Sequence, residues 1–140
     1  YAAAAPKEAA LIIVGDGRER KKIEHLAKKL SARHVFFEGE RDAAPYYQEA
    51  DLVLFPSKYD GYGLVIVEAL AAGKPVLSTD VGAAKELGAI IASEHDFTSA
   101  LKEWVEKGSR EAALANYPYE NFDAYVRAYA DDVGACAPRK

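Results

Sequence analysis

Two carboxylates flank a glycine-rich turn in the stretch YDGYGLVIVEALAAGKPV, residues 59–76. Asp60 precedes Gly61 and Gly63, and Glu68 follows inside an apolar run. Glycine adopts backbone angles that a Cβ would block, so such a turn brings the main chain close to a ligand. Two acids around it indicate a binding site.

The apolar run after the turn, residues 64–73, predicts a helix that begins near Gly63 and ends at Gly73, with Pro75 shortly beyond. The start of a helix exposes N–H groups and a positive dipole end, which together suit a phosphate. Asp60 can accept sugar hydroxyls there. Because apolar residues surround Glu68, we expect it to be partly buried, needing a protein donor or a bound ribose. The alternative is a glutamate on the helix's solvent-exposed face.

Alternating apolar runs predict the elements that position these residues. Short continuous runs at 10–15, 34–40, 51–56, 75–79 and 89–92 predict buried strands. Helical patterns cover 15–32, 42–50, 64–73, 95–108, 109–116 and 119–133. The alternation predicts a single α/β domain over residues 1–140, with a doubly wound parallel sheet and C-terminal helices.

Ligands of such sheets bind beyond the carboxyl ends of the strands. The loops GDGRER, EGERD, PSKYDGYG and STDVG follow those ends and are expected to line one crevice. GDGRER lacks the third glycine of the dinucleotide fingerprint, because Arg20 stands at that position. We interpret it as a tight strand-to-helix turn, in which Gly15 and Gly17 could still bring the main chain close to a ligand.

Composition excludes several classes of function. The 140 residues carry a net charge of −4, with a pI of about 5.4, so no basic excess indicates nucleic acid or an anionic membrane. Cys136 is the only cysteine, which excludes a disulfide framework and a cysteine zinc site. No apolar run approaches the roughly 18 residues of a transmembrane helix. A cytoplasmic location is expected.

The segment FPSKYDGYGLVIVEALAAGKPVLSTDVG resembles the donor-site motif of retaining glycosyltransferases of family 4, which have the GT-B architecture. LIIVGDGRERKKIEHLAKKL and VFFEGE…YYQEADLVLFPS resemble the preceding segments of that family in the same order. The resemblance covers about residues 10–87. It implies a Rossmann-like domain, one half of a GT-B enzyme.

The resemblance also implies roles for individual residues. Asp60 would hold hydroxyls of the donor sugar, and we take it as the catalytic candidate. Glu68 would bind the ribose of the nucleotide. The remaining donor-binding residues would be Gly61, Tyr62, Gly63 and Leu64 at the sugar and diphosphate, with Gly15, Asp16 and Gly17 at the nucleoside. No metal or cofactor is expected, because protein cations and helix dipoles would stabilise the leaving diphosphate.

The sequence departs from the family pattern in three places. The first acid is usually glutamate, and here it is Asp60. The arginine and lysine that clamp the diphosphate belong to an earlier strand and loop that the sequence lacks, and we do not assign their role to Lys58. The stretch after Leu87 is shortened. We expect the first strand and helix and the acceptor-binding domain to be missing, and this chain alone to be inactive or very weak.

The predicted function is donor binding in a retaining glycosyltransferase that takes a nucleotide sugar as its partner. Through its missing part, the enzyme could lie at the inner membrane face. The first alternative is a stand-alone nucleotide-sugar-binding module or subunit that works with a separate acceptor-binding chain. The others are another GT-B enzyme, such as a nucleotide-sugar epimerase, and a purely structural α/β domain. The aromatic residues near the C-terminus, Tyr117, Tyr119, Phe122, Tyr125 and Tyr129, are expected to serve packing.

Overall fold

The computed structural model describes residues 1–116, 124, 126–128, 130 and 131. Residues 124, 126–128, 130 and 131 are helical, as expected for the final segment. Cys136 and the aromatic residues Tyr117, Tyr119, Phe122, Tyr125 and Tyr129 lie outside the described residues. The described helices include none that is long and apolar enough to cross a lipid bilayer.

Strands and helices alternate through the first two thirds of the chain, as the apolar runs predict. The strands are β1 (Leu11–Val14), β2 (Val35–Gly39), β3 (Val53–Phe55), β4 (Val76–Ser78) and β5 (Ile90–Ile91). The helices are α1 (Arg20–Lys29), α2 (Ala44–Glu49), α3 (Leu64–Ala71) and α4 (Phe97–Lys107). Helix α3 stops where expected, because Gly73 takes a left-handed φ of 76° just beyond it.

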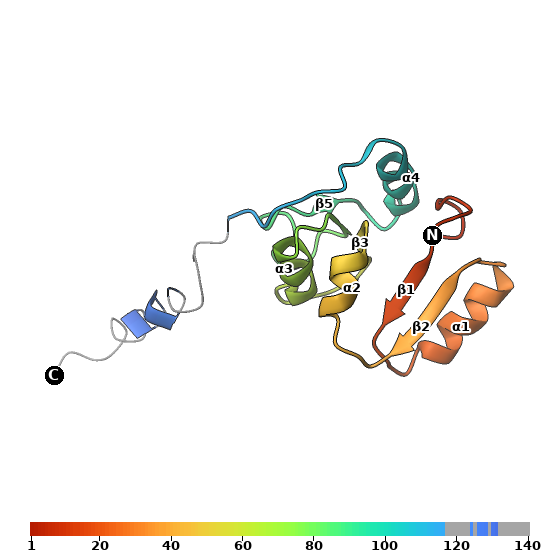
Figure 1. The fold of residues 1–140 in the computed structure, drawn as a ribbon, viewed down its shortest axis with the longest axis horizontal. Helices are drawn as coiled ribbons and strands as arrows, with labels where there is room; N and C mark the ends of the chain where they lie inside the picture. Colours follow the sequence, from red (N-terminus) through yellow and green to blue (C-terminus); the bar gives the residue numbers. More distant parts are fainter. Residues whose placement is uncertain (117–123, 125, 129, 132–140) are drawn as a thin grey trace.

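Every strand pair is parallel, so the predicted α/β class is confirmed. Strand β1 pairs with β2, with Leu11 opposite Val35. Strand β4 lies between β3 and β5, with Leu54 of β3 opposite Leu77 of β4. The strands form two sheets rather than one continuous sheet, because β1 and β3 share no ladder of hydrogen bonds. Figure 1 shows β1 between β2 and the side of the molecule that holds β3 and α2.

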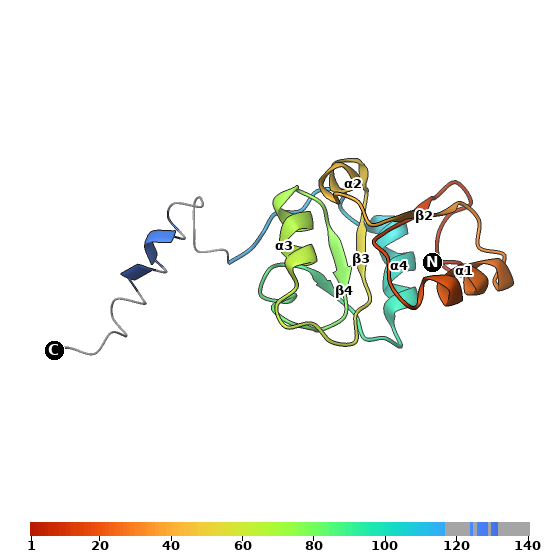
Figure 2. The same ribbon diagram turned by 90° about the horizontal axis from the view of Figure 1, so that it is seen from below.

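The core lies on both faces of the sheet formed by β3, β4 and β5. Figure 2 shows β3 and β4 between α3 and α4. On the α3 side, fully or nearly fully buried side chains form one cluster, which consists of Ile66, Ala69, Leu70, Val76, Ala84 and Leu87. On the α4 side the second cluster consists of Leu77, Ala92 and Leu101. Parallel strands covered on both faces read as continuous apolar runs, which explains the sequence pattern.

The unit formed by β1, α1 and β2 is less well covered. No residue from Tyr1 to Glu38 is buried. Ile12 and Phe36 stand opposite each other on the two strands and are each about half exposed. Tight packing therefore begins at β3, and it is this later part of the fold that holds the glycine-rich turn in place.

The helix predicted over residues 109–116 is wrong. This segment has no regular secondary structure and runs past the end of α3. Its main chain bonds to other elements instead: the Ala112 N–H donates to the Gly73 carbonyl at 3.1 Å, and the Ala115 N–H to the Leu87 carbonyl at 2.9 Å. These tertiary hydrogen bonds, and the packing of Leu114 against the core cluster on the α3 side, outweigh the local helix propensity of its alanines.

Candidate donor-binding site

Only one of the two glycines in the turn before α3 has the backbone geometry that the sequence predicts. Gly63 has a φ of 91° and precedes the first residue of α3; a Cβ there would lie 3.0 Å from Cδ1 of Ile66. Any other residue at position 63 would therefore be strained, which favours glycine there. Gly61 has no positive φ, and the space around it is open. The expectation that a Cβ would block the turn at Gly61 is wrong.

Asp60 lies at the start of this turn, as predicted, and holds it closed. Its Oδ1 accepts the Tyr62 N–H at 2.9 Å. This bond spans two residues, which is the usual pattern of an aspartate that initiates a turn. It leaves Oδ2 without a protein partner among the described residues, so that oxygen is free to accept a hydroxyl group from a ligand.

The first turn of α3 is open. No side chain caps it, and the N–H groups of Leu64 and Val65 donate to no acceptor within the described part of the chain. Both of these side chains are exposed. Uncapped N–H groups at a helix start carry partial positive charge, so this end of α3 can bind an anion such as a diphosphate.

The loop after β4 supports the turn through contacts that the sequence did not predict. The Ala83 N–H donates to the Tyr62 carbonyl at 3.1 Å. A Cβ on Gly82 would lie 2.7 Å from that same carbonyl group, and Gly82 has a φ of 54°. Thr79 is buried, and its hydroxyl donates to the carbonyls of Ser57 and Phe55. The glycine of the STDVG loop was the signal available in the sequence.

Glu68 is exposed, so the prediction that it is partly buried is wrong. Helix α3 turns Ile66, Ala69 and Leu70 into the core, and Glu68 lies on the other face. A protein donor does reach it: the hydroxyl of Tyr47 on α2 donates to Oε2 of Glu68 at 3.0 Å. Burial, followed by this hydrogen bond, raises the pKa of Tyr47 to about 12.

Tyr47 and Glu68 line an open hollow between α2 and α3. Its volume is about 530 Å³. Its other lining residues are Asp42, Ala43, Ala44, Gln48 and Ala72. Asp42 lies just before α2, and its Oδ1 accepts the Ala44 N–H at 3.0 Å. The hollow therefore lies beside the first turn of α2 and the second half of α3, and its lining includes neither Asp60 nor the residues of the first turn of α3.

The loop from β1 to α1 is joined to the end of β2. The Gly15 N–H donates to the Gly39 carbonyl at 2.6 Å. Asp16 accepts the Gly17 N–H at 2.6 Å and binds Arg20 at 3.0 Å. These two donors, the main-chain N–H first, lower the pKa of Asp16. Asp16 is thus already paired within its own loop. A nucleoside bound beside this loop would therefore contact mainly the main chain.

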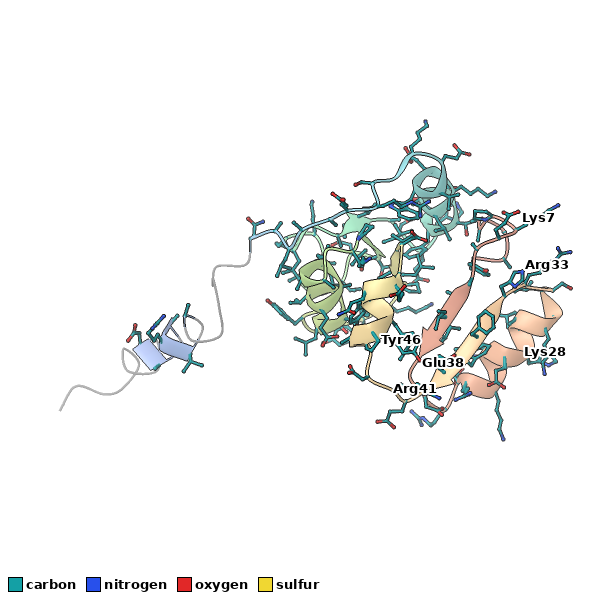
Figure 3. The ribbon with its side chains drawn as sticks, in the orientation of Figure 1. Lys7, Lys28, Arg33, Glu38, Arg41 and Tyr46 are labelled. Carbon is teal, nitrogen blue, oxygen red and sulfur yellow. The ribbon has the colours of Figure 1, made fainter. Side chains whose placement is uncertain are left out.

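The carboxylate of Glu38, at the carboxyl end of β2, has two polar partners. It accepts the Tyr46 hydroxyl at 3.1 Å and lies 3.5 Å from Nε of Arg41. Figure 3 shows these three side chains together near the loop that leads to α2. Adjacent tyrosines on α2 thus bind two different carboxylates: Tyr46 binds Glu38 on β2, and Tyr47 binds Glu68 on α3.

The lysine that precedes the turn in sequence, Lys58, is also paired. Nζ of Lys58 lies 3.2 Å from Oε2 of Glu94, on the segment after β5. Within the described residues, no three side chains of the metal-ligating types lie close enough to share an ion. The uncapped N–H groups of α3 are thus the feature of this region that suits an anion.

A parallel α/β fold with an uncapped helix start beyond its strands is the architecture of nucleotide-binding domains. Comparison with known sequences gives the family. The chain belongs to the family described as "Glycosyl transferases group 1", whose model matches residues 2–110. The expected GT-B glycosyltransferase family is thereby confirmed.

Curated relatives carry glycosyltransferase names. The chain is 43% identical over 65 residues to the lipopolysaccharide core biosynthesis mannosyltransferase LpsB of Rhizobium meliloti, covering 46% of this chain and 18% of that protein. It is 42% identical over 73 residues to the lipopolysaccharide glucosyltransferase WaaG of Escherichia coli, covering 51% and 19%. The matches thus span about a fifth of the length of these relatives.

Solved structures share the fold. HepE of Anabaena, in complex with UDP-glucose, superposes with a TM-score of 0.77 at 24% identity, covering 96% of this chain and 43% of that one. A sucrose-phosphate synthase from Thermosynechococcus elongatus superposes with a TM-score of 0.71 at 24% identity, covering 91% and 39%. At this identity the superpositions establish the fold, and they agree with the parallel α/β arrangement described above.

Proposed function

We propose that this chain is the donor-binding part of a retaining glycosyltransferase, which transfers a sugar from a nucleoside diphosphate sugar to an acceptor hydroxyl. The observation that carries the proposal is the uncapped start of α3, with Asp60 at the start of the turn that precedes it and Glu68 one helical turn into it. Family membership supports the proposal, since the relatives named above are sugar transferases.

The diphosphate binds the free N–H groups of Leu64 and Val65, where the helix dipole favours negative charge. Asp60 orients the donor sugar through the carboxylate oxygen that the turn leaves unused. Glu68 binds the ribose hydroxyls from the hollow beside α2. The main chain at Gly15, Asp16 and Gly17 borders the nucleoside.

In the transfer step, the bond between the anomeric carbon and the diphosphate oxygen breaks, and the diphosphate leaves with the electron pair. The acceptor oxygen bonds to the same carbon on the same face, and its proton passes to the departing diphosphate. The N–H groups of α3 stabilise the negative charge that develops on the leaving group. No metal or cofactor is needed for this role.

The acceptor site and the cationic clamp for the diphosphate lie, in this proposal, in sequence outside these 140 residues. A second candidate function follows: a subunit that binds the nucleotide sugar and works with a separate acceptor-binding chain. One relative, 36% identical over 70 residues, is named as the GtfA subunit of a UDP-N-acetylglucosamine–peptide N-acetylglucosaminyltransferase of Streptococcus parasanguinis. Transfer activity that appears only when a second chain is added would favour this candidate.

Calorimetric titration with UDP, GDP and ADP tests donor binding. UDP is the expected ligand, because HepE binds UDP-glucose. Weak binding of one nucleotide is expected, and Glu68→Ala should abolish it or reduce the affinity by at least about tenfold, since a lost hydrogen bond to a charged group costs roughly 1.5–3 kcal/mol. Glu103→Ala, on α4, is the matched control. Equal affinities in the parent and Glu68→Ala would remove Glu68 from the site.

A further inference from the structure

The hydrogen bond between Tyr47 and Glu68 joins α2 to α3 at the edge of the hollow. The Tyr47 ring packs against the core cluster on the α3 side, so its position is fixed by buried neighbours. Its hydroxyl lies 3.0 Å from Oε2 of Glu68. A side chain anchored in the core thus holds one that is exposed to solvent.

An exposed glutamate without a partner rotates about its side-chain bonds, and fixing it costs conformational entropy when a ligand binds. The bond from Tyr47 removes much of that freedom before any ligand arrives. It occupies one side of Oε2 and leaves Oε1 of Glu68 without a protein partner among the described residues. A carboxylate held in this way can still accept two neighbouring hydroxyl groups.

We propose that Tyr47 is a positioning residue, whose hydroxyl holds Glu68 ready for the vicinal hydroxyls of a ribose. The inference rests on the proposed function and extends it: Tyr47 makes the site select nucleotides that carry both the 2′ and the 3′ hydroxyl. Tyr47 acts through Glu68 and does not itself touch the diphosphate.

The protonation state of Tyr47 suits this role. Because burial and the neighbouring carboxylate raise the pKa of Tyr47 to about 12, its hydroxyl keeps its proton at every pH at which the protein would be assayed. It therefore always donates to Glu68 and never repels it as a phenolate.

The test compares three ligands on two proteins by calorimetry: UDP, 2′,3′-dideoxy-UDP and inorganic pyrophosphate, on the parent and on Tyr47→Phe. Phenylalanine keeps the ring that packs in the core and removes only the hydroxyl. The parent should bind UDP more tightly than the dideoxy analogue. Tyr47→Phe should bind UDP about fivefold more weakly than the parent does, with no change for the other two ligands.

Tyr46→Phe is the matched control, because it removes the same group from the next residue of α2, whose partner is Glu38. It should leave the ratio of UDP to dideoxy-UDP affinity unchanged. A purely structural role for Tyr47 predicts a different result: Tyr47→Phe would then weaken UDP, dideoxy-UDP and pyrophosphate by the same factor.

The outcomes separate this inference from the proposed function. If Glu68→Ala weakens UDP binding but Tyr47→Phe does not, the proposed function stands and the positioning role is refuted. Equal weakening of all three ligands by Tyr47→Phe also refutes it. If the parent binds none of UDP, GDP and ADP, both proposals fail.

Discussion

Gly82 lies directly against the main chain of Tyr62, and the contact leaves no room for a side chain. A Cβ on Gly82 would stand 2.7 Å from the carbonyl carbon and from the carbonyl oxygen of Tyr62. The next residue, Ala83, donates its N–H to that oxygen at 3.1 Å. The loop after β4 therefore fixes the turn that presents the start of α3, so two loops far apart in sequence form one supporting structure.

Gly82→Ala should destabilise the fold, because the methyl group meets main-chain atoms and the φ of 54° is unfavourable for alanine. We expect the free energy of unfolding to fall by about 2–3 kcal/mol, measured by urea denaturation. Gly61→Ala, in the same region, is the control and should change it by less than about 0.5 kcal/mol, since the space there is open. Equal losses in the two variants would contradict the close contact at Gly82.

The side chains of α3 divide sharply between the core and the solvent. Ile66 is fully buried, whereas Leu64 is 67% exposed. Ile66→Ala should lower the free energy of unfolding by about 2–5 kcal/mol, because it leaves a cavity. Leu64→Ala should cost less than about 1 kcal/mol and should retain nucleotide binding, since the proposed contact is made by its N–H. Loss of UDP binding in folded Leu64→Ala would count against a main-chain contact.

Asp16 should make the stability of the fold depend on pH in the acid range. The Gly17 N–H and Arg20 lower its pKa below the ordinary 3.8, so ionised Asp16 stabilises the folded state above about pH 4. This contribution is lost as the pH falls through the lowered pKa. The difference in unfolding free energy between the parent and Asp16→Asn should therefore shrink on acidification, measured by denaturation at a series of pH values. A difference that stays constant across the pH series would show that these donors do not lower the pKa of Asp16 in the folded state.

Thr79 should stabilise the folded state through its buried hydroxyl, which donates to the carbonyls of Phe55 and Ser57 at the end of β3. Thr79→Val keeps the shape and removes the donor, so we expect a loss of about 1–2 kcal/mol in the free energy of unfolding. Thr98→Val makes the same change at an exposed position of α4 and should be nearly neutral. Similar values for the two variants would mean that the hydroxyl of Thr79 contributes no more than an exposed one.

The sequence predicted those features that are determined by residues close together in the chain. Continuous apolar runs predicted the five strands, and Gly73 predicted the end of α3, because glycine there takes the left-handed conformation. The turn from Asp60 to Gly63 was also predictable, since an aspartate before glycines has few other structural uses. These features depend on neighbours within a few residues.

Features that depend on distant contacts were not predictable. Residues 109–116 look helical by composition, yet their main chain bonds to Gly73 and Leu87. Glu68 has apolar neighbours in the sequence, but α3 is covered on one face only, so Glu68 is exposed. The partner of Glu68, Tyr47, lies 21 residues earlier, and no local pattern joins the two.

The central claim is that the start of α3 receives the diphosphate, and amide NMR tests it most directly. We predict that UDP and inorganic pyrophosphate each shift the amide signals of Leu64 and Val65, whereas uridine, which lacks the diphosphate, leaves them in place. Shifts on addition of UDP that spare Leu64 and Val65 and fall elsewhere in the protein would contradict the account.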